Sequence, residues 1–339
     1  MLRIHGRKWF SSSLCACITA ALVLFSLEGC DPTYPKKNLP AVVKTVCKTE
    51  YDMDVDVTVI GSTMGIYYKM EGLLEPSLQI SEKSWDTITD LVTIASRVVL
   101  STDADIKFYC VITQDIRLPE LQVVIIKYVD DVKRSMFRYI SRSESFRRTL
   151  FSINLTPQAK KEKSIERIFD KMKVEDEIRQ NILDDFFRSL PTRLSDIGYW
   201  RGSFYLKNIS MQEFLAAQIA NRIKIEFRSE EDLKTKFRFI SSEGLFTVNE
   251  GIKVITVRFK IDDQTVSLPV NVLRQEKTKE IIGIVDTVVS GYKYEDFDLL
   301  LLEDQLENVV LTVKAKDLFN FTEKKLPIIE IVDVSEGYF

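Results

Sequence analysis

The sequence Ile106-Lys-Phe-Tyr-Cys-Val-Ile112 predicts a β-strand. Apolar side chains alternate along it, and those that share one face are Ile106, Phe108, Cys110 and Ile112. A turn that contains Pro119 joins this strand to residues 121–129, which are largely apolar. Such a run is typical of a strand that is buried on both faces of its sheet. The two segments therefore predict a β-hairpin within a folded core.

A helix and an earlier hairpin are predicted upstream of this pair. Ser84 is a suitable helix N-cap, and residues 85–100 carry apolar side chains at helical spacing. Before it, apolar residues alternate through 51–60, a glycine-containing turn follows at 61–65, and a returning strand covers 66–70. The order along the chain is thus hairpin, helix, hairpin.

A further helix is predicted to open at Asp131, with Met136, Phe137 and Ile140 facing inward. Its other face is basic and carries Lys133, Arg134, Arg138, Arg142, Arg147 and Arg148. A basic face of this kind can contact anionic lipid or cell-wall polymer. We favour the simpler interpretation of a solvated face that pairs in part with Asp130 and Glu144.

The last third of the chain repeats this order. Residues 252–261 follow a turn, 279–289 predict a helix, and 297–302 with 309–313 predict a second hairpin and then a short helix. The helices start 194 residues apart, from Ser84 to Thr278, and the following strands 191 apart. We therefore predict an α+β fold with two strand-rich domains, antiparallel sheets and packed helices. A diverged ββαββα duplication is one explanation of the repeat, and coincidence of a common α+β order is the other.

The middle of the chain is charged and predicted to be helical, with a start signal at Thr156-Pro157. It ends in an aromatic cluster formed by Tyr199, Trp200, Phe204 and Tyr205. This cluster is a candidate binding surface for sugars or a partner protein, or it packs the junction between domains. The predicted divisions are a signal peptide at 1–29, a tether at 30–46, an α+β domain at 47–150, a helical segment at 151–230 and a second α+β domain at 231–339.

The first thirty residues have the plan of a secretory signal. Arg3, Arg7 and Lys8 form a basic start, and residues 14–27 form an apolar stretch that is short for a membrane span. The stretch ends in Leu27-Glu28-Gly29-Cys30, which resembles the lipobox of bacterial lipoproteins. The alternative is an ordinary secretory signal followed by a chance cysteine.

This resemblance implies that cleavage falls before Cys30 and that Cys30 becomes the acylated N-terminus. The mature chain is then expected in the bacterial cell envelope, outside the cytoplasm and anchored to either the inner or the outer membrane. Prolines at positions 32, 35 and 40 predict an extended tether of on the order of 45 Å between lipid and domain.

Histidine usage excludes several kinds of active site. The only histidine of the 339 residues is His5, inside the predicted signal peptide. Ser-His-Asp and Cys-His nucleophilic sites, HExxH zinc sites and imidazole bases are therefore excluded. Carboxylate chemistry stays open, but the pairs Asp103/Asp105 and Asp130/Asp131 do not form a convincing acid–base couple.

Net charge and cysteines complete the composition. The chain has 47 Lys+Arg and 50 Asp+Glu, and residues 1–29 contain three bases and one acid, so the mature chain carries 44 against 49. Such an acidic balance argues against nucleic acid as a partner. Cys47 and Cys110 remain once the signal peptide is removed and Cys30 carries the lipid. They either form a disulfide in an oxidising compartment or stay buried as free thiols, and we favour the free thiols.

These observations favour a non-enzymatic binding or assembly-support lipoprotein of the envelope, without cofactor or metal. Its expected contacts are the membrane, through the lipid, and another envelope protein or cell-wall polymer. A solute-binding receptor is the alternative and requires a cleft between the two domains. A carboxylate-dependent hydrolase is the third class.

The lipid anchor gives the first prediction. Replacement Cys30→Ala should block processing or release a soluble chain, because it removes the residue that carries the lipid. The lipid expected on Cys30 has two acyl chains in its diacylglyceryl group, and two chains hold a protein on a membrane stably where one does so only reversibly. The wild-type chain should stay with membranes in high salt, which screens electrostatic attachment. Fractionation and intact-mass analysis of the mature N-terminus test this. An unmodified N-terminus other than Cys30, or unchanged membrane attachment of the variant, contradicts it.

Overall fold

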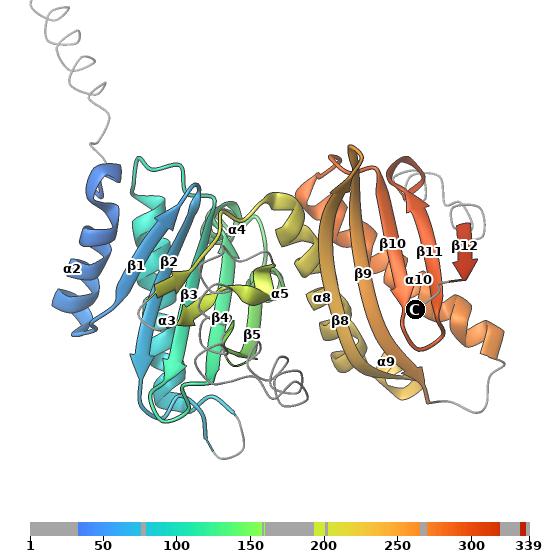
Figure 1. Cartoon of the computed structure of the whole chain (residues 1–339), viewed down its shortest axis with the longest axis horizontal. Helices are drawn as coiled ribbons and strands as arrows, with labels where there is room; N and C mark the ends of the chain where they lie inside the picture. The colour runs from blue at the N-terminus through green and yellow to red at the C-terminus, as the bar shows by residue number, and fades with distance from the viewer. Residues whose placement is uncertain are drawn as a thin grey trace, which may run out of the picture.

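The computed structural model describes residues 33–75, 79–157, 159, 193–200, 203–264, 270–318 and 333–336. Two five-stranded sheets lie next to each other, with helix α8 (Met211–Ser229) between them (Figure 1). Each sheet has helices packed against it, so the predicted α+β class with two strand-rich units is confirmed. We call the parts built on the two sheets the first and the second unit.

The first sheet has the strand order β1-β2-β3-β4-β5. Its strands are β1 (Asp56–Ile60), β2 (Thr63–Met70), β3 (Phe108–Asp115), β4 (Leu121–Tyr128) and β5 (Leu150–Leu155). All neighbours are antiparallel except β2 and β3, which are parallel. The sheet is therefore mixed, not purely antiparallel as expected. Helix α3 (Glu82–Leu100) causes this, because it returns the chain to the end at which β2 began.

The second sheet repeats this arrangement. Its strands, in spatial order from one edge, are β8 (Phe237–Asn249), β9 (Ile252–Asp263), β10 (Leu299–Asp304), β11 (Val309–Lys314) and β12 (Asp333–Glu336). Helix α10 (Val270–Tyr292) connects the parallel pair β9 and β10. Thr63 lies opposite Phe108 in the first sheet, and Val254 lies opposite Leu299 in the second, each 191 residues later. The matching strand order that a duplication predicts is confirmed.

The start of the described chain corrects the expected tether. Residues 36–38 form a 3₁₀ turn, and helix α2 (Leu39–Tyr51) follows directly. Leu39, Val43 and Cys47 of α2 are buried in the first core. Pro40 does not prevent this helix, because the first turn of a helix needs no backbone donor at that position. Residues 39–46 are thus part of the fold and not an extended linker.

The segment after β4 differs from its prediction as well. Helix α4 (Val129–Met136) is short and is followed by helix α5 (Arg142–Arg147). Met136 and Phe137 are 68% and 65% exposed, so the inward orientation expected for them is wrong. The cause is the end of α4 at Met136, after which Arg138 adopts a left-handed backbone conformation (φ 61°) and turns the chain.

The remaining elements connect the two units. They are the 3₁₀ turn η2 (Leu194–Asp196), the hairpin β6 (Gly198–Trp200) and β7 (Ser203–Tyr205), helix α8 and helix α9 (Glu231–Lys236). Part of the middle segment predicted to be helical, including residues 160–192, lies outside the described residues. None of the helices that the structure describes combines the length and the apolar character needed to cross a bilayer.

Helix α8 belongs to two hydrophobic cores. One face of the first sheet packs against α2 and α3, and its other face packs against Ile197, Leu206, Ile209 and Phe214. Phe214 lies in the first turn of α8 and packs 5.2 Å from the ring of Phe108. From Leu215 onward, the buried side chains of α8 join those of α10 on the second sheet. The two units are therefore connected by a shared helix.

A glycine on β8 sets how closely α8 approaches the second sheet. A Cβ atom at Gly244 would lie 1.8 Å from the carbonyl oxygen of Ala216 in α8. Gly244→Ala should therefore push α8 off the sheet and lower the free energy of unfolding by about 2–3 kcal/mol. Gly283→Ala is the matched control, since a Cβ there meets nothing within 4 Å and should gain ~0.5–1 kcal/mol of helix propensity. Urea denaturation measures both, and an unchanged stability of Gly244→Ala contradicts the packing described.

Candidate functional site

A cleft of about 440 Å³ lies where the two units meet. Helix α8 forms its floor, strand β5 of the first sheet forms one wall, and strand β8 of the second sheet forms the other (Figure 1). The side chains of α8 that face it recur at helical spacing and are Glu213, Ala217, Ala220, Asn221 and Lys224. A cleft between two domains is what a protein with an internal binding site requires.

Both walls of the cleft are edge strands. Strand β5 is the last strand of the first sheet, and β8 is the first strand of the second. An edge strand presents backbone N–H and C=O groups on the side that has no neighbouring strand. The hydroxyl of Ser242 donates to the carbonyl of Ala220 (2.7 Å) and holds β8 against α8. Among the described residues, the cleft therefore combines two strand edges that have no neighbouring strand with a floor that is bonded to one of them.

Lys224 is a half-buried cation at the cleft that has no partner among the described residues. The side chain of Lys224 makes no ion pair or hydrogen bond within the part of the chain that the structure describes. Burial lowers the pKa of Lys224, and the positive charge of Arg228 lowers it further. By contrast, Arg193 at the cleft pairs with Glu243 of β8 (3.2 Å). An anionic group in the cleft would relieve the unfavourable charge at Lys224.

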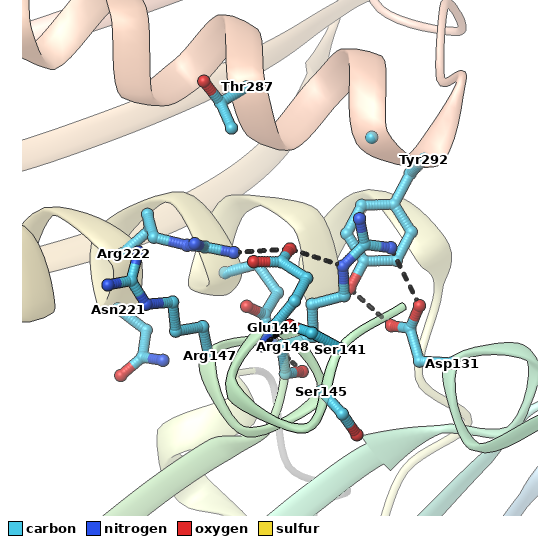
Figure 2. Close-up of polar contacts among 12 residues, drawn as sticks. Asp131, Ser141, Glu144, Ser145, Arg147, Arg148, Asn221, Arg222, Thr287 and Tyr292 are labelled. Carbon is cyan, nitrogen blue, oxygen red and sulfur yellow. Dashed lines mark hydrogen bonds and ion pairs between the residues drawn. The ribbon is translucent and has the colours of Figure 1, made fainter. Parts of the chain in front are cut away.

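The joint next to the cleft is held by a buried ionic network. We call this set the joint network; its members are Asp131, Glu144, Arg147, Arg148, Arg222, Glu226 and Tyr292. Figure 2 shows Asp131 of α4 between two donors. Arg148 donates to one carboxylate oxygen (3.0 Å), and the hydroxyl of Tyr292, from the end of α10, donates to the other (2.6 Å). Residues of the first and second units thus share one buried carboxylate.

Glu144 of α5 extends the joint network to helix α8. Its carboxylate accepts hydrogen bonds from Arg148 (2.7 Å) and from Arg222 of α8 (2.8 Å), as Figure 2 shows. Arg147 donates to Glu226 of α8 (2.9 Å). The side chains of Arg148 and Arg222 are only 10% and 6% exposed. Because charges at this depth require partners, the network holds α4, α5, α8 and α10 in one arrangement.

Burial and ion pairing explain the pKa shifts of the two carboxylates in this network. Burial raises the pKa of Asp131, although the Tyr292 hydrogen bond and the Arg148 charge act in the opposite direction. Burial alone would also raise the pKa of Glu144, but hydrogen bonds from Arg222 and Arg148 hold it below its ordinary value. The two carboxylate oxygens that accept from Arg148, Oδ1 of Asp131 and Oε1 of Glu144, are thus both engaged in ion pairs.

Neither family models, curated proteins nor solved structures give a match to this chain.

The structure separates one of the two carboxylate pairs considered for hydrolysis. Asp131 is buried in the joint network, whereas Asp130 is exposed and pairs with Lys133 (3.4 Å). Asp103 accepts from the backbone N–H of Lys36 (2.5 Å) near the N-terminus. No group of three or more possible metal ligands occurs among the residues that the structure describes. Asp130 and Asp131 therefore do not form a common site.

The predicted aromatic surface is described only in part. Tyr199, Trp200 and Phe204 lie on the hairpin β6–β7, where Tyr199 is opposite Phe204, but their side chains are outside the described part. Tyr205 is 8% exposed, which assigns this one ring to packing. Cys30 also lies outside the described residues.

The two cysteines of the fold are free and buried, as expected. Cys110 packs with Phe108 and Ile112 on the face that the alternation predicted. Burial raises the pKa of the Cys47 thiol to about 11, and it raises that of Cys110 as well. Both thiols are therefore unreactive at neutral pH.

Sequence reasoning missed the cleft and most of the joint network. Arg147 and Arg148 were expected on a solvated face, but both pair at the joint. The expected pairing of this face with Glu144 and Asp130 does occur. The roles of Lys224 and Arg222 could not be predicted from the sequence, because the residues that surround them belong to strands and helices distant in the chain. A capping box of Ser210 and Glu213 fixes the start of α8, which forms the floor of the cleft.

Replacement Glu144→Gln tests the joint network. It should lower the free energy of unfolding at pH 7 by about 2 kcal/mol, below the ~3–5 kcal/mol of a fully buried pair, because the side chain is 29% exposed. Since the folded pKa of Glu144 is depressed, its contribution is present above pH 4.5, the ordinary value, and is lost as the pH falls through the folded pKa. The variant should therefore lose less stability than the wild type on acidification.

The control is Glu231→Gln, which removes an ion pair with Lys234 at a glutamate that is 77% exposed. It should change stability by no more than about 0.5 kcal/mol. Thermal and urea denaturation at neutral and acidic pH measure both variants. Equal losses in the two would show that the joint network contributes no more than a surface pair.

Proposed function

We propose that this protein is a lipid-anchored envelope protein that binds an extended segment of another envelope protein in the cleft between its units. The observation that carries this proposal is the cleft itself: its walls are strands that have no further strand beside them among the described residues, and on its floor the Lys224 side chain has no partner in that part of the chain. An extended chain satisfies an edge strand by adding to it through main-chain hydrogen bonds. An acidic side chain on that segment would pair with Lys224.

The anchor is the second part of the proposal and is supported by the sequence alone. The basic start, the short apolar stretch and Leu27-Glu28-Gly29-Cys30 resemble a lipoprotein signal. A non-enzymatic role is supported by the absence of histidine beyond His5 and by carboxylates that are engaged in ion pairs at the joint.

A solute-binding receptor is the second candidate function. The volume of the cleft, about 440 Å³, lies within the range of small-molecule sites and favours this alternative. Receptors of this kind commonly close two domains about a hinge. Here the joint network and the shared helix α8 oppose such a motion, so we favour a partner that enters a preformed cleft.

Site-specific photo-crosslinking in native membranes tests the proposal. A photoreactive residue at Leu245, which lines the cleft, should form a defined protein adduct, whereas one at Val248 should not, because Val248 lies on β8 outside the cleft. Lys224→Glu should reduce the adduct by roughly tenfold or more, which corresponds to the loss of ~1.4 kcal/mol of binding.

Lys279→Glu is the charge-matched control, since Lys279 is an exposed residue of α10 away from the cleft. It should leave the adduct unchanged. Equal adducts at Leu245 and Val248, or equal effects of the two lysine replacements, exclude the cleft as the site. An adduct of small mass in place of a protein would favour the solute receptor.

A further inference from the structure

The most exposed aromatic side chains of the described chain lie within residues 136–146, which comprise the end of α4, a short loop and most of helix α5. Phe137 is 65% exposed, Tyr139 is 79% exposed, and Phe146 is 64% exposed, and Met136 beside them is 68% exposed. Two arginines, Arg138 and Arg142, lie between them in the sequence. We call this set, Met136, Phe137, Arg138, Tyr139, Arg142 and Phe146, the aromatic–arginine surface. Exposed apolar groups at this density mark an interaction site.

The loop is rigid although its side chains are exposed. The N–H of Tyr139 donates to the carbonyl of Arg134 (2.7 Å), and that of Arg138 donates to Ser135 (3.1 Å), which is the bond pattern of a Schellman helix end. Glycine is the usual residue at the left-handed position of this motif, yet Arg138 occupies it. The Ser141 side chain then caps α5 by accepting from the N–H of Glu144 (3.0 Å). The chain therefore presents an arginine between two rings on a fixed turn.

The charge of this surface is positive, and no acidic side chain of the described residues pairs with it. The side chains of Arg138 and Arg142 make no ion pair or hydrogen bond with any residue in the described ranges. The nearest acid in the sequence, Glu144, is engaged by Arg148 and Arg222 in the joint network. Aromatic rings next to arginines favour the interface of an anionic bilayer, where rings enter the headgroup region and arginines contact lipid phosphates.

The N-terminal end of the fold adds a geometric argument, which rests on the proposed anchor at Cys30. The N–H of Tyr34 donates to the carbonyl of Ser101 (3.2 Å), so the chain is fixed to the first unit from this residue onward. Only residues 31–33 separate it from Cys30, and four backbone steps span at most about 14 Å. An anchored chain therefore has this end of the first unit at the membrane surface.

The aromatic–arginine surface begins at the same end of the first sheet. The carbonyl of Lys107, a few residues beyond Ser101, accepts from the N–H of Val129, the first residue of α4 (2.9 Å). Helix α4 is only eight residues long and leads directly into the exposed loop. We propose that the aromatic–arginine surface is a second membrane contact, which binds the surface of a bilayer that contains anionic phospholipid.

The test uses the full mature chain from Asp31 onward, without its lipid, since the described fold begins at residue 33. In flotation assays this chain should bind vesicles of phosphatidylcholine with one third phosphatidylglycerol, and it should bind pure phosphatidylcholine vesicles at least about fivefold more weakly. Phe137→Ser with Tyr139→Ser should reduce binding by about tenfold or more. Arg138→Gln with Arg142→Gln should reduce it to the level of neutral vesicles.

The control is Ile116→Ser with Leu118→Ser, which removes two exposed apolar side chains from the β3–β4 turn at the opposite end of the same sheet. It should leave binding unchanged, and thermal unfolding should confirm that all variants fold. Absence of binding by the unmodified chain, or an equal loss in the control, overturns the proposal. Retained vesicle binding by both loop variants, with loss of a protein adduct instead, would assign the surface to a protein partner and overturn it as well.

Failure here is distinguishable from failure of the proposed function. Lys224→Glu alters the cleft and should bind vesicles like the unmodified chain, whereas the loop variants should keep the photo-adduct at Leu245. The anchor is tested separately by Cys30→Ala, because the vesicle assay uses a chain without lipid.

Discussion

Helix α8 is the constraint on which the rest of the structure depends. Its first turn contributes Phe214 to the core on the first sheet, and its next turns contribute Leu215 and Ile219 to the core on the second. A helix of 19 residues is a rod of about 28 Å, so the two cores cannot move independently without one of them losing buried surface. The joint network adds charged contacts from α5 to the same helix. The relative position of the units is therefore part of the folded state.

The repeat explains why the cleft has strand edges as walls. The two sheets have the same order, so β8 is the counterpart of β1 and β5 is the counterpart of β12. The cleft thus joins unlike edges of two equivalent sheets. In both units a helix packs before the first strand, α2 before β1 and α8 before β8. Helix α8 therefore serves as the packing helix of its own unit while it closes the exposed face of the unit before it.

The sequence predicted elements whose signals are local. Alternation at 106–112 and the apolar run from Leu121 correctly predicted β3 and β4, and their recurrence 191 residues later predicted the second sheet. Helix α2 was missed because Pro40 was interpreted as part of an extended tether, although it occupies the first helical turn. The end of α4 was missed because Arg138, not glycine, takes the left-handed position. The cleft was not predictable, since its walls are brought together only by the packing of α8.

The short connection between Cys30 and Tyr34 and the joint network together restrict the position of the cleft relative to the membrane. If Cys30 carries the lipid, at most about 14 Å separate it from Tyr34, so the first unit cannot move far from the bilayer. Because α8 and the joint network fix the second unit to the first, the cleft then has a restricted height and orientation above the membrane. A receptor that captures a diffusing solute gains nothing from such restriction. A protein that receives a segment of a neighbouring membrane component gains effective concentration, because both partners are held in the same layer.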